Sequence, residues 1–165
     1  IAFSDVICGG SVNQNRLVSI KNANVPNREE RIKAASMAVK AVYKVGFHFD
    51  PISEYSDWET KYYETLEFLF SKIPANKIAW ISLGTFRIFP SLKEIIRKRH
   101  IKSLTTFSEL VTGYDNKLRY FKKNRVEIYS KMKLWIENLG NNIVPVYLCM
   151  ESQKVWEEVF YKEME

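Results

Sequence analysis

The chain has few of the side chains that hold metals and redox centres. Its 165 residues include only two cysteines, Cys8 and Cys149, and two histidines. Two cysteines cannot form a disulfide framework, so we expect a reducing compartment, the cytoplasm. Zinc sites and iron–sulfur clusters draw several ligands from these residue types, so we expect no metal site built by this chain alone.

Long apolar runs are absent as well. No stretch approaches the roughly 20 apolar residues that a membrane-spanning helix needs, and the chain does not open on a signal-peptide pattern. We therefore expect no membrane association. The first residue is Ile1 rather than Met, and IAFS already resembles part of a strand. We therefore expect the carboxyl-terminal portion of a longer protein.

Hydrophobic residues nevertheless make up 46% of the sequence and aromatic residues 14%. This composition is typical of a globular protein and argues against disorder. The length suits one domain with a sizeable core. We predict a single domain over residues 1–165, of unknown oligomeric state.

The formal charge of +6 is unevenly distributed. Residues 97–125 hold nine Lys or Arg and two acids, a local balance of +7 that leaves −1 for the rest of the chain. A basic patch concentrated in one segment suits a polyanion such as DNA or another nucleic acid. A run of charge can also be a solvated face, and both alternatives stay open here.

Helix and strand patterns alternate through the first part of the chain. This order predicts parallel strands joined by crossover helices. The predicted elements are a helix over 28–43 capped by Asn27 with Glu30, a strand over 45–52, a helix opened by a capping box at 56–59, a strand over 77–84 and a helix from Pro90.

The alternation ends after His100. A turn signal between two strand-like stretches predicts a hairpin, and apolar spacing predicts further helices. The predicted elements are a hairpin with its turn over 112–117, a helix capped by Asn124, an edge strand over 143–149 and a helix capped by Ser152.

The strand over 45–52, VGFHFDPI, carries two ionisable residues. Side chains alternate along a strand, so Phe47 and Phe49 point to one face and His48 and Asp50 to the other. Ionisable groups at the carboxyl end of an apolar strand must be paired or must face a cavity. The alternatives are a His48–Asp50 hydrogen bond that stabilises the strand end, and a site at the rim where α/β proteins bind ligands.

Several stretches together resemble the second half of spore photoproduct lyase-like radical S-adenosylmethionine proteins, often labelled DNA-repair photolyases. The most specific are VGFHFDPI and ISLGTFR (81–87). The likeness covers nearly the whole chain from Ser11. The other matching stretches are SVN (11–13), NREERIKAA (27–35), PSLKEIIRKRH (90–100) and VYLCMES (146–152).

This resemblance implies a fold and a chemistry. The fold is α/β, part of a parallel, partial TIM-like (β/α) barrel, with barrel units in residues 1–100 and a hairpin, helix, edge strand and helix extension in 101–165. The chemistry is cleavage of S-adenosylmethionine by a 4Fe–4S cluster to a 5′-deoxyadenosyl radical, which acts on DNA or a nucleotide-like substrate.

The resemblance also implies cluster cysteines spaced CxxxCxxC, and this chain has no such motif. We expect the motif in a missing amino-terminal half of the same protein, and neither the cluster nor S-adenosylmethionine chemistry in this chain alone. The alternative function is a non-catalytic nucleic-acid-binding α/β module. No catalytic residue is assigned, and Cys149 is interpreted as a small buried hydrophobe rather than a hydrogen donor.

The resemblance makes Ser11, Asn13, His48 and Asp50 candidate cofactor-binding residues. For Ser11 and Asn13 the alternative is loop-capping hydrogen bonds, because both types are common in turns. His48 has the intrinsic pKa of a proton carrier, although no such role is assigned to it.

Candidate substrate-binding residues follow the next strand and fill the basic segment. Arg87, just beyond that strand, could hold a phosphate bidentately or lie on the surface. In the basic segment, cations would contact phosphates while aromatic rings stack on bases, unless the aromatic residues belong to the core. The candidates are Ser82, Thr85, Arg87, Lys117, Arg119, Tyr120 and Arg125.

Overall fold

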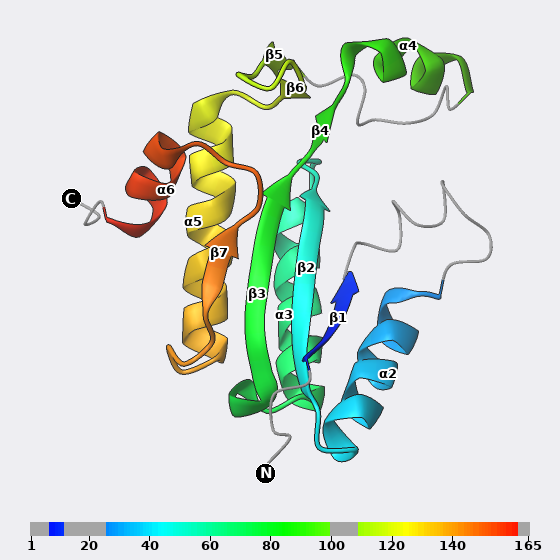
Figure 1. The fold of residues 1–165 in the computed structure, drawn as a ribbon, viewed down its shortest axis with the longest axis vertical. Coiled ribbons are helices and arrows are strands. Elements are labelled where there is room, and N and C mark those ends of the chain that lie inside the picture. The colour runs from blue at the N-terminus through cyan, green and yellow to red at the C-terminus, as the bar shows by residue number, and fades with distance from the viewer. Residues whose placement is uncertain (1–6, 12–25, 100–108, 162–165) are drawn as a thin grey trace.

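A four-stranded parallel sheet forms the centre of the computed structural model, which describes residues 7–11, 26–99 and 109–161. Its strand order is β1-β2-β3-β7, and every neighbouring pair runs parallel. All four strands therefore end at the same edge (Figure 1). The strands are β1 (Ile7–Ser11), β2 (Lys44–Ile52), β3 (Ile78–Thr85) and β7 (Val146–Leu148).

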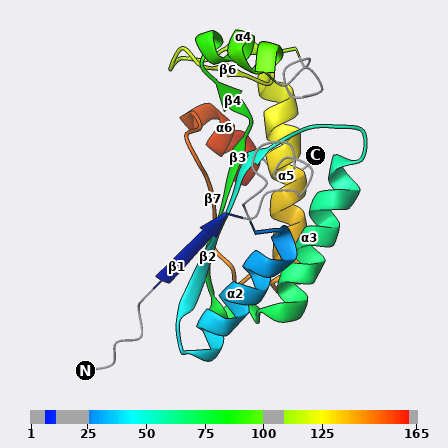
Figure 2. The same cartoon turned by 90° about the vertical axis from the view of Figure 1, so that its right-hand side faces the viewer.

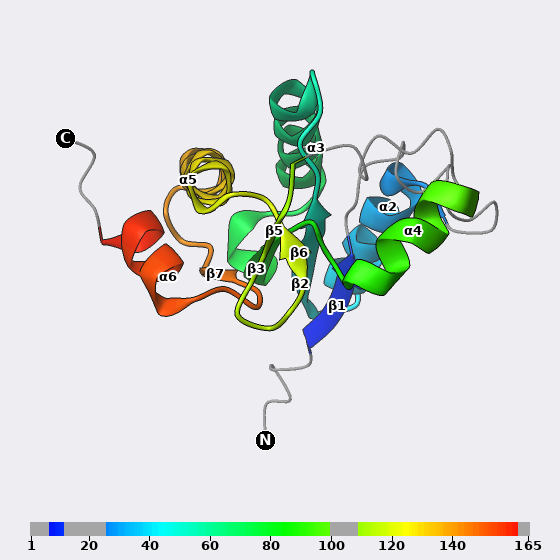
Figure 3. The ribbon, with the colours of Figure 1, turned by 90° about the horizontal axis from the view of Figure 1, so that it is seen from above.

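Helices lie along one face of this sheet. Figures 2 and 3 show α2, α3 and α5 side by side on that face, while α6 packs beside α5 near the β7 edge. Along β1, β2 and β3, no helix of the described ranges covers the other face. The helices are α2 (Arg28–Lys40), α3 (Trp58–Lys72), α5 (Lys122–Leu139) and α6 (Gln153–Phe160), and a short 3-10 turn spans Ala75–Lys77.

The core lies between the sheet and these helices. Phe47 and Phe49 of β2 are 2% and 0% exposed, whereas His48 and Asp50 are half-buried on the opposite face. The predicted alternation along β2 is therefore confirmed. The helices contribute one apolar stripe each, as amphipathic helices do. Fully buried members of these stripes are Ile32, Tyr62, Leu66, Leu69, Met132 and Ile136.

A small antiparallel sheet lies beyond the carboxyl ends of the main strands. Its order is β4-β6-β5, built from β4 (Arg87–Ile88), β5 (Val111–Thr112) and β6 (Leu118–Arg119). The predicted hairpin is confirmed, but the sequence did not indicate that β4 would add to it. Helix α4 (Pro90–Arg99) follows β4 at the same end of the molecule (Figure 1).

The ends of α2 follow the predicted rules only at its start. Asn27 Oδ1 accepts the Glu30 N–H at 2.9 Å while Glu30 Oε2 accepts the Asn27 N–H at 2.8 Å, so the predicted capping box forms. The prediction of helix up to residue 43 was wrong by three residues. Val42 has a φ of 76° and is 76% exposed, so its side chain leaves the apolar stripe.

The other predicted caps are not formed. The N-cap of α3 is Asp57, and its side chain makes no capping bond. Helix α5 begins two residues before Asn124, with Phe121 as N-cap, and Asn124 instead donates to Glu54 at 3.2 Å. Ser152 is the N-cap of α6, although its hydroxyl makes no capping bond. Packing of the apolar faces therefore sets these helix starts more than side-chain capping does.

Candidate functional site

One residue from each main strand lies in register in the carboxyl-terminal half of the sheet. Ser11, His48, Ser82 and Tyr147 are aligned by the parallel register of β1, β2, β3 and β7. The Nδ1 of His48 lies 2.6 Å from Ser82 Oγ. Since Ser82 is fully buried and His48 is half-buried, this bond fixes the imidazole at the border between core and solvent.

Aromatic rings flank this bond. The rings of His48 and Trp80 meet edge to face at 4.7 Å, and Trp80 lies 5.6 Å from Tyr147. The indole passes directly over Gly46, where an added Cβ would lie 2.4 Å from two of its ring carbons. Gly46 is therefore required for the close approach of Trp80. The result is a half-buried aromatic surface with polar groups at its border, which suits a flat, partly polar ligand.

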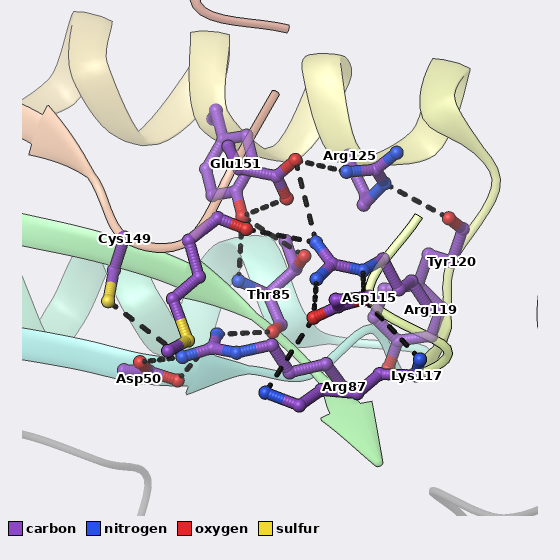
Figure 4. A network of polar contacts seen from close by, with 12 residues as sticks. Asp50, Thr85, Arg87, Asp115, Lys117, Arg119, Tyr120, Arg125, Cys149 and Glu151 are labelled. Carbon is purple, nitrogen blue, oxygen red and sulfur yellow. Dashed lines mark hydrogen bonds and ion pairs between the residues drawn. The ribbon is translucent and has the colours of Figure 1, made fainter. Parts of the chain in front are cut away.

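The carboxylate of Asp50 is clamped by Arg87 rather than bonded to His48. Nη1 and Nη2 of Arg87 donate to Oδ1 and Oδ2 at 3.2 and 2.7 Å, and Nη1 also donates to the Thr85 carbonyl at 3.3 Å (Figure 4). Of the two alternatives for this strand, the His48–Asp50 hydrogen bond is not formed, because Ser82 bonds His48 and Arg87 bonds Asp50. Gly84 leaves the space for this pair, because a Cβ there would lie 2.8 Å from Asp50 Cγ.

Cys149 joins this cluster from the end of β7. Its Sγ lies 3.8 Å from Arg87 Nη2, and its N–H donates to the Leu83 carbonyl at 2.7 Å. Burial and the nearby Asp50 carboxylate raise the pKa of the thiol, although Arg87 acts in the opposite direction. Cys149 is therefore a neutral, half-buried thiol beside the ion pair.

A second polar network extends from the end of β3 to the hairpin (Figure 4). The Tyr129 hydroxyl accepts the Thr85 N–H at 2.8 Å and donates to Glu151 Oε1 at 2.9 Å. Glu151 Oε2 bonds Arg125 and lies 3.9 Å from Arg119. Burial, with the adjacent Glu151 charge, raises the pKa of Tyr129, so its hydroxyl stays a donor.

The structure brings the four basic-segment candidates to this network. Arg119 donates to Asp115 at 2.5 Å and to the Met150 carbonyl at 3.0 Å, and its side chain is 3% exposed. Tyr120 is 2% exposed and accepts the Glu54 N–H at 3.2 Å. These two side chains, with the 12% exposed Arg125, support the fold from inside. Their part in substrate binding stays a prediction.

Lys117 is the candidate cation nearest to the outer surface of the hairpin. Its Nζ lies 3.6 Å from Asp115 and 5.1 Å from the centre of the Phe89 ring. Tyr114 at the hairpin tip is 73% exposed, and its ring lies 5.3 Å from the Arg119 guanidinium. The hairpin thus exposes the Tyr114 ring at its tip, while the Lys117 side chain, 19% exposed, is the least buried of the three candidate cations in the basic segment.

Two further points concern cofactor and metal binding. Ser11 is placed by its backbone register only, and Asn13 lies outside the described residues. Within the described ranges, no group of three His, Cys, Asp or Glu could hold a metal ion, and no helix is long and apolar enough to cross a membrane. His48, Ser82 and Asp50 remain the polar groups at the aromatic surface that could contact a cofactor.

Sequence reasoning missed three residues of these networks. Trp80 could have been found from alternation, since it lies two residues before Ser82 and so shares its face. Glu151 follows a predicted strand end, a position that favours site residues. Tyr129 lies on the buried face of α5, where its hydroxyl needs a partner, but the sequence does not identify that partner.

A parallel α/β sheet, helices along one face and polar residues at the carboxyl rim define an α/β protein with a strand-end site. A family model described as Spore photoproduct lyase matches residues 8–139. The chain belongs to the spore photoproduct lyase family. No curated protein sequence matches it.

Solved structures of spore photoproduct lyase have the same fold. A cysteine-to-alanine mutant superposes with a TM-score of 0.74 at 21% identity, over 87% of this chain and 44% of that one. A structure complexed with dinucleoside spore photoproduct gives 0.72 at 21% identity, over 87% and 44%. A double mutant with bound AdoMet and dinucleoside spore photoproduct gives 0.70 at 20% identity, over 86% and 43%. The chain thus spans less than half the length of these relatives.

Proposed function

We propose that this chain is the carboxyl-terminal part of a radical S-adenosylmethionine enzyme that acts on DNA or a nucleotide-like substrate. Its sheet would then form one side of a partial (β/α) barrel, with residues 1–100 supplying barrel units and 101–165 an extension. The family match supports this, as do the AdoMet and the DNA-derived dinucleoside bound to structural relatives.

One observation carries the proposal: the most specific family stretches meet at one rim of the sheet. VGFHFDPI supplies His48 and Asp50, ISLGTFR supplies Ser82 and Arg87, and side-chain bonds join them in pairs. The helices cover the opposite face. In a (β/α) barrel the face without helices lines the interior, and ligands bind at the rim formed by the carboxyl ends of the strands.

The cluster and the S-adenosylmethionine differ in how they fit these residues. A 4Fe–4S cluster needs cysteine ligands that Cys8 and Cys149 cannot supply, so this chain does not hold it. S-adenosylmethionine fits better, because Trp80 and Tyr147 offer ring surfaces while His48 and Asp50 offer polar contacts. When bound to a cluster-bearing partner, it would supply the radical.

The roles of this chain's own residues follow from their geometry. Ser82 holds Nδ1 of His48, which leaves Nε2 as the imidazole nitrogen for a ligand hydroxyl or ring nitrogen. Arg87 fixes the Asp50 carboxylate through two hydrogen bonds. Ser11 and Asn13 would complete the cofactor side, and Thr85 with Lys117, Arg119, Tyr120 and Arg125 would position the substrate or the elements around it.

The cofactor part is tested by titrating S-adenosylmethionine into the chain while recording tryptophan indole N–H signals by NMR. The Trp80 signal should shift, and that of Trp58, buried on the helix side, should not. His48→Gln should weaken binding about tenfold through the lost contact, whereas Lys33→Gln on exposed α2 should not. Equal shifts at both tryptophans, or none at millimolar ligand, would contradict the assignment.

The reaction itself needs the cluster. Mixing the chain with a cluster-bearing amino-terminal half of a spore photoproduct lyase and adding a reductant should yield 5′-deoxyadenosine, measured by chromatography. If single-stranded DNA binds the chain but no such product forms with any complementing half, the non-catalytic binding module becomes the better description.

A further inference from the structure

Three consecutive residues after β7 connect the main sheet to the hairpin. Cys149 bonds the end of β3 through its N–H, and the Met150 carbonyl accepts Arg119 Nη1 at 3.0 Å. Met150 has a φ of 55°, so the chain turns sharply there. Glu151 then points to α5. This short turn thus contacts the sheet, the hairpin and a helix.

Glu151 is the charged centre of this connection. Its side chain is 2% exposed and bonds Arg125, lies 3.9 Å from Arg119, and accepts the Tyr129 hydroxyl at 2.9 Å. A buried carboxylate is costly unless it is paired and hydrogen-bonded, and removing one partner leaves the others uncompensated. Both carboxylate oxygens are used, so Glu151 and the two arginines depend on one another.

Arg119 passes the effect of this charge to the hairpin. It is a β6 residue whose backbone pairs with Arg87 of β4 and Val111 of β5. Its guanidinium also holds Asp115 in the hairpin turn through Nε and Nη2. A shift of this side chain would therefore move the hairpin relative to the main sheet.

We propose that Glu151 is a positioning residue: its charge holds the β5–β6 hairpin against the carboxyl ends of β2 and β3, and so sets how Tyr114 and Lys117 meet a single-stranded nucleic acid. The second half of this statement rests on the nucleic-acid contact of the proposed function; the first half does not.

The test compares Glu151→Gln with Glu157→Gln in the 165-residue chain. Both remove one negative charge near α6, but Glu157 is exposed and its carboxylate accepts a hydrogen bond from the exposed Gln153 at 2.8 Å. Gln at 151 can still accept the Tyr129 hydroxyl, so the change isolates the charge. A further variant, Glu151→Gln with Arg125→Gln, restores the charge balance.

The first readout is amide hydrogen exchange without nucleic acid. In Glu151→Gln, the N–H groups of Gly113 and Asn116, bonded within the hairpin, should exchange about tenfold faster, while β3 amides keep their rates. The balanced double variant should recover most of the protection, and Glu157→Gln should match the wild type. Unchanged hairpin exchange in Glu151→Gln, or equally faster exchange in the sheet, would overturn the positioning role.

The second readout is binding of a labelled oligo-dT of about ten nucleotides, followed by anisotropy at several salt concentrations. Glu151→Gln should bind several-fold more weakly than Glu157→Gln although their net charges are equal. Equal affinities would overturn the link to binding. If the wild type fails to bind at low salt, the nucleic-acid part of the proposed function fails, and the exchange data alone decide the positioning role.

Discussion

Two groups of arginines and acids lie near each other in the folded protein (Figure 4), and their side chains differ in exposure. At the strand ends, the side chains of Arg87 and Asp50 are 16% and 24% exposed. Behind the hairpin, those of Arg119 and Glu151 are 3% and 2% exposed. The first pair can exchange its partners for a ligand, whereas the second can only support the fold around it. A basic sequence segment is therefore not by itself a basic surface.

The largest effect should come from Arg119→Ala. It leaves the buried Glu151 with one arginine less and frees Asp115, so we expect the free energy of unfolding to fall by about 3–5 kcal/mol. Urea unfolding followed by tryptophan fluorescence measures this. Lys123→Ala, an exposed change on α5, should stay within about 0.5 kcal/mol. A loss below about 1 kcal/mol for Arg119→Ala would remove the contrast between the two groups.

Tyr129→Phe should have the next largest effect. It removes the acceptor of the Thr85 N–H and the donor to Glu151, both buried, so we expect a loss of about 1–3 kcal/mol in the same assay. The matched control is Tyr63→Phe, whose ring is 37% exposed. Equal effects of the two changes would mean that the hydroxyl network adds nothing to stability.

Asp50→Asn should cost less, about 1 kcal/mol, because solvent partly screens this ion pair, which is more exposed than the Arg119–Glu151 pair. A double-mutant cycle with Arg87→Gln should give a coupling energy of similar size. Gly84→Ala should reproduce the loss without removing a charge, since its Cβ would displace the pair. A coupling energy above about 3 kcal/mol would mean that this pair behaves like the buried Arg119–Glu151 group instead.

The smallest effect should appear in acid. Burial would raise the pKa of Asp115, but hydrogen bonds from Arg119 and the Lys117 N–H outweigh it and lower the pKa. The folded pKa lies below the unfolded one, so Asp115 stabilises the protein above about pH 4 and this contribution is lost as pH falls through the folded value. The free energy of unfolding of the wild type should therefore fall more between pH 5 and about pH 2.5 than that of Asp115→Asn. Parallel pH curves would contradict this.

Apolar periodicity was enough to predict most of the fold. The alternation in VGFHFDPI predicted the buried face of β2, and the helical spacing of Tyr62, Leu66 and Leu69 matches the buried face of α3. Such patterns work because burial of apolar area dominates the folding energy. The predicted caps at Ser56 and Asn124 are not formed, because a capping bond contributes only about 1 kcal/mol, which packing easily overrides.

The sequence could not predict which residues of the site bond to one another. His48 and Asp50 were correctly placed at the rim, but Ser82 and Arg87 are 34 and 37 residues away along the chain, and only the strand register joins them. Arg119 points inward toward Glu151, which follows it by more than thirty residues and lies in the turn between β7 and α6. Pairings of this kind arise from tertiary contacts that no local pattern encodes.

Gly46 lies beneath the indole of Trp80, and the shape of the uncovered face depends on its lack of a side chain. With any larger residue there, the ring would have to lift by an ångström or more, since two of its carbons already lie 2.4 Å from the vacant Cβ position. The contacts of Trp80 with His48 and Tyr147 would then change. In this protein, the absence of a Cβ at Gly46 lets the indole of Trp80 lie close to the sheet on the face that could bind a ligand.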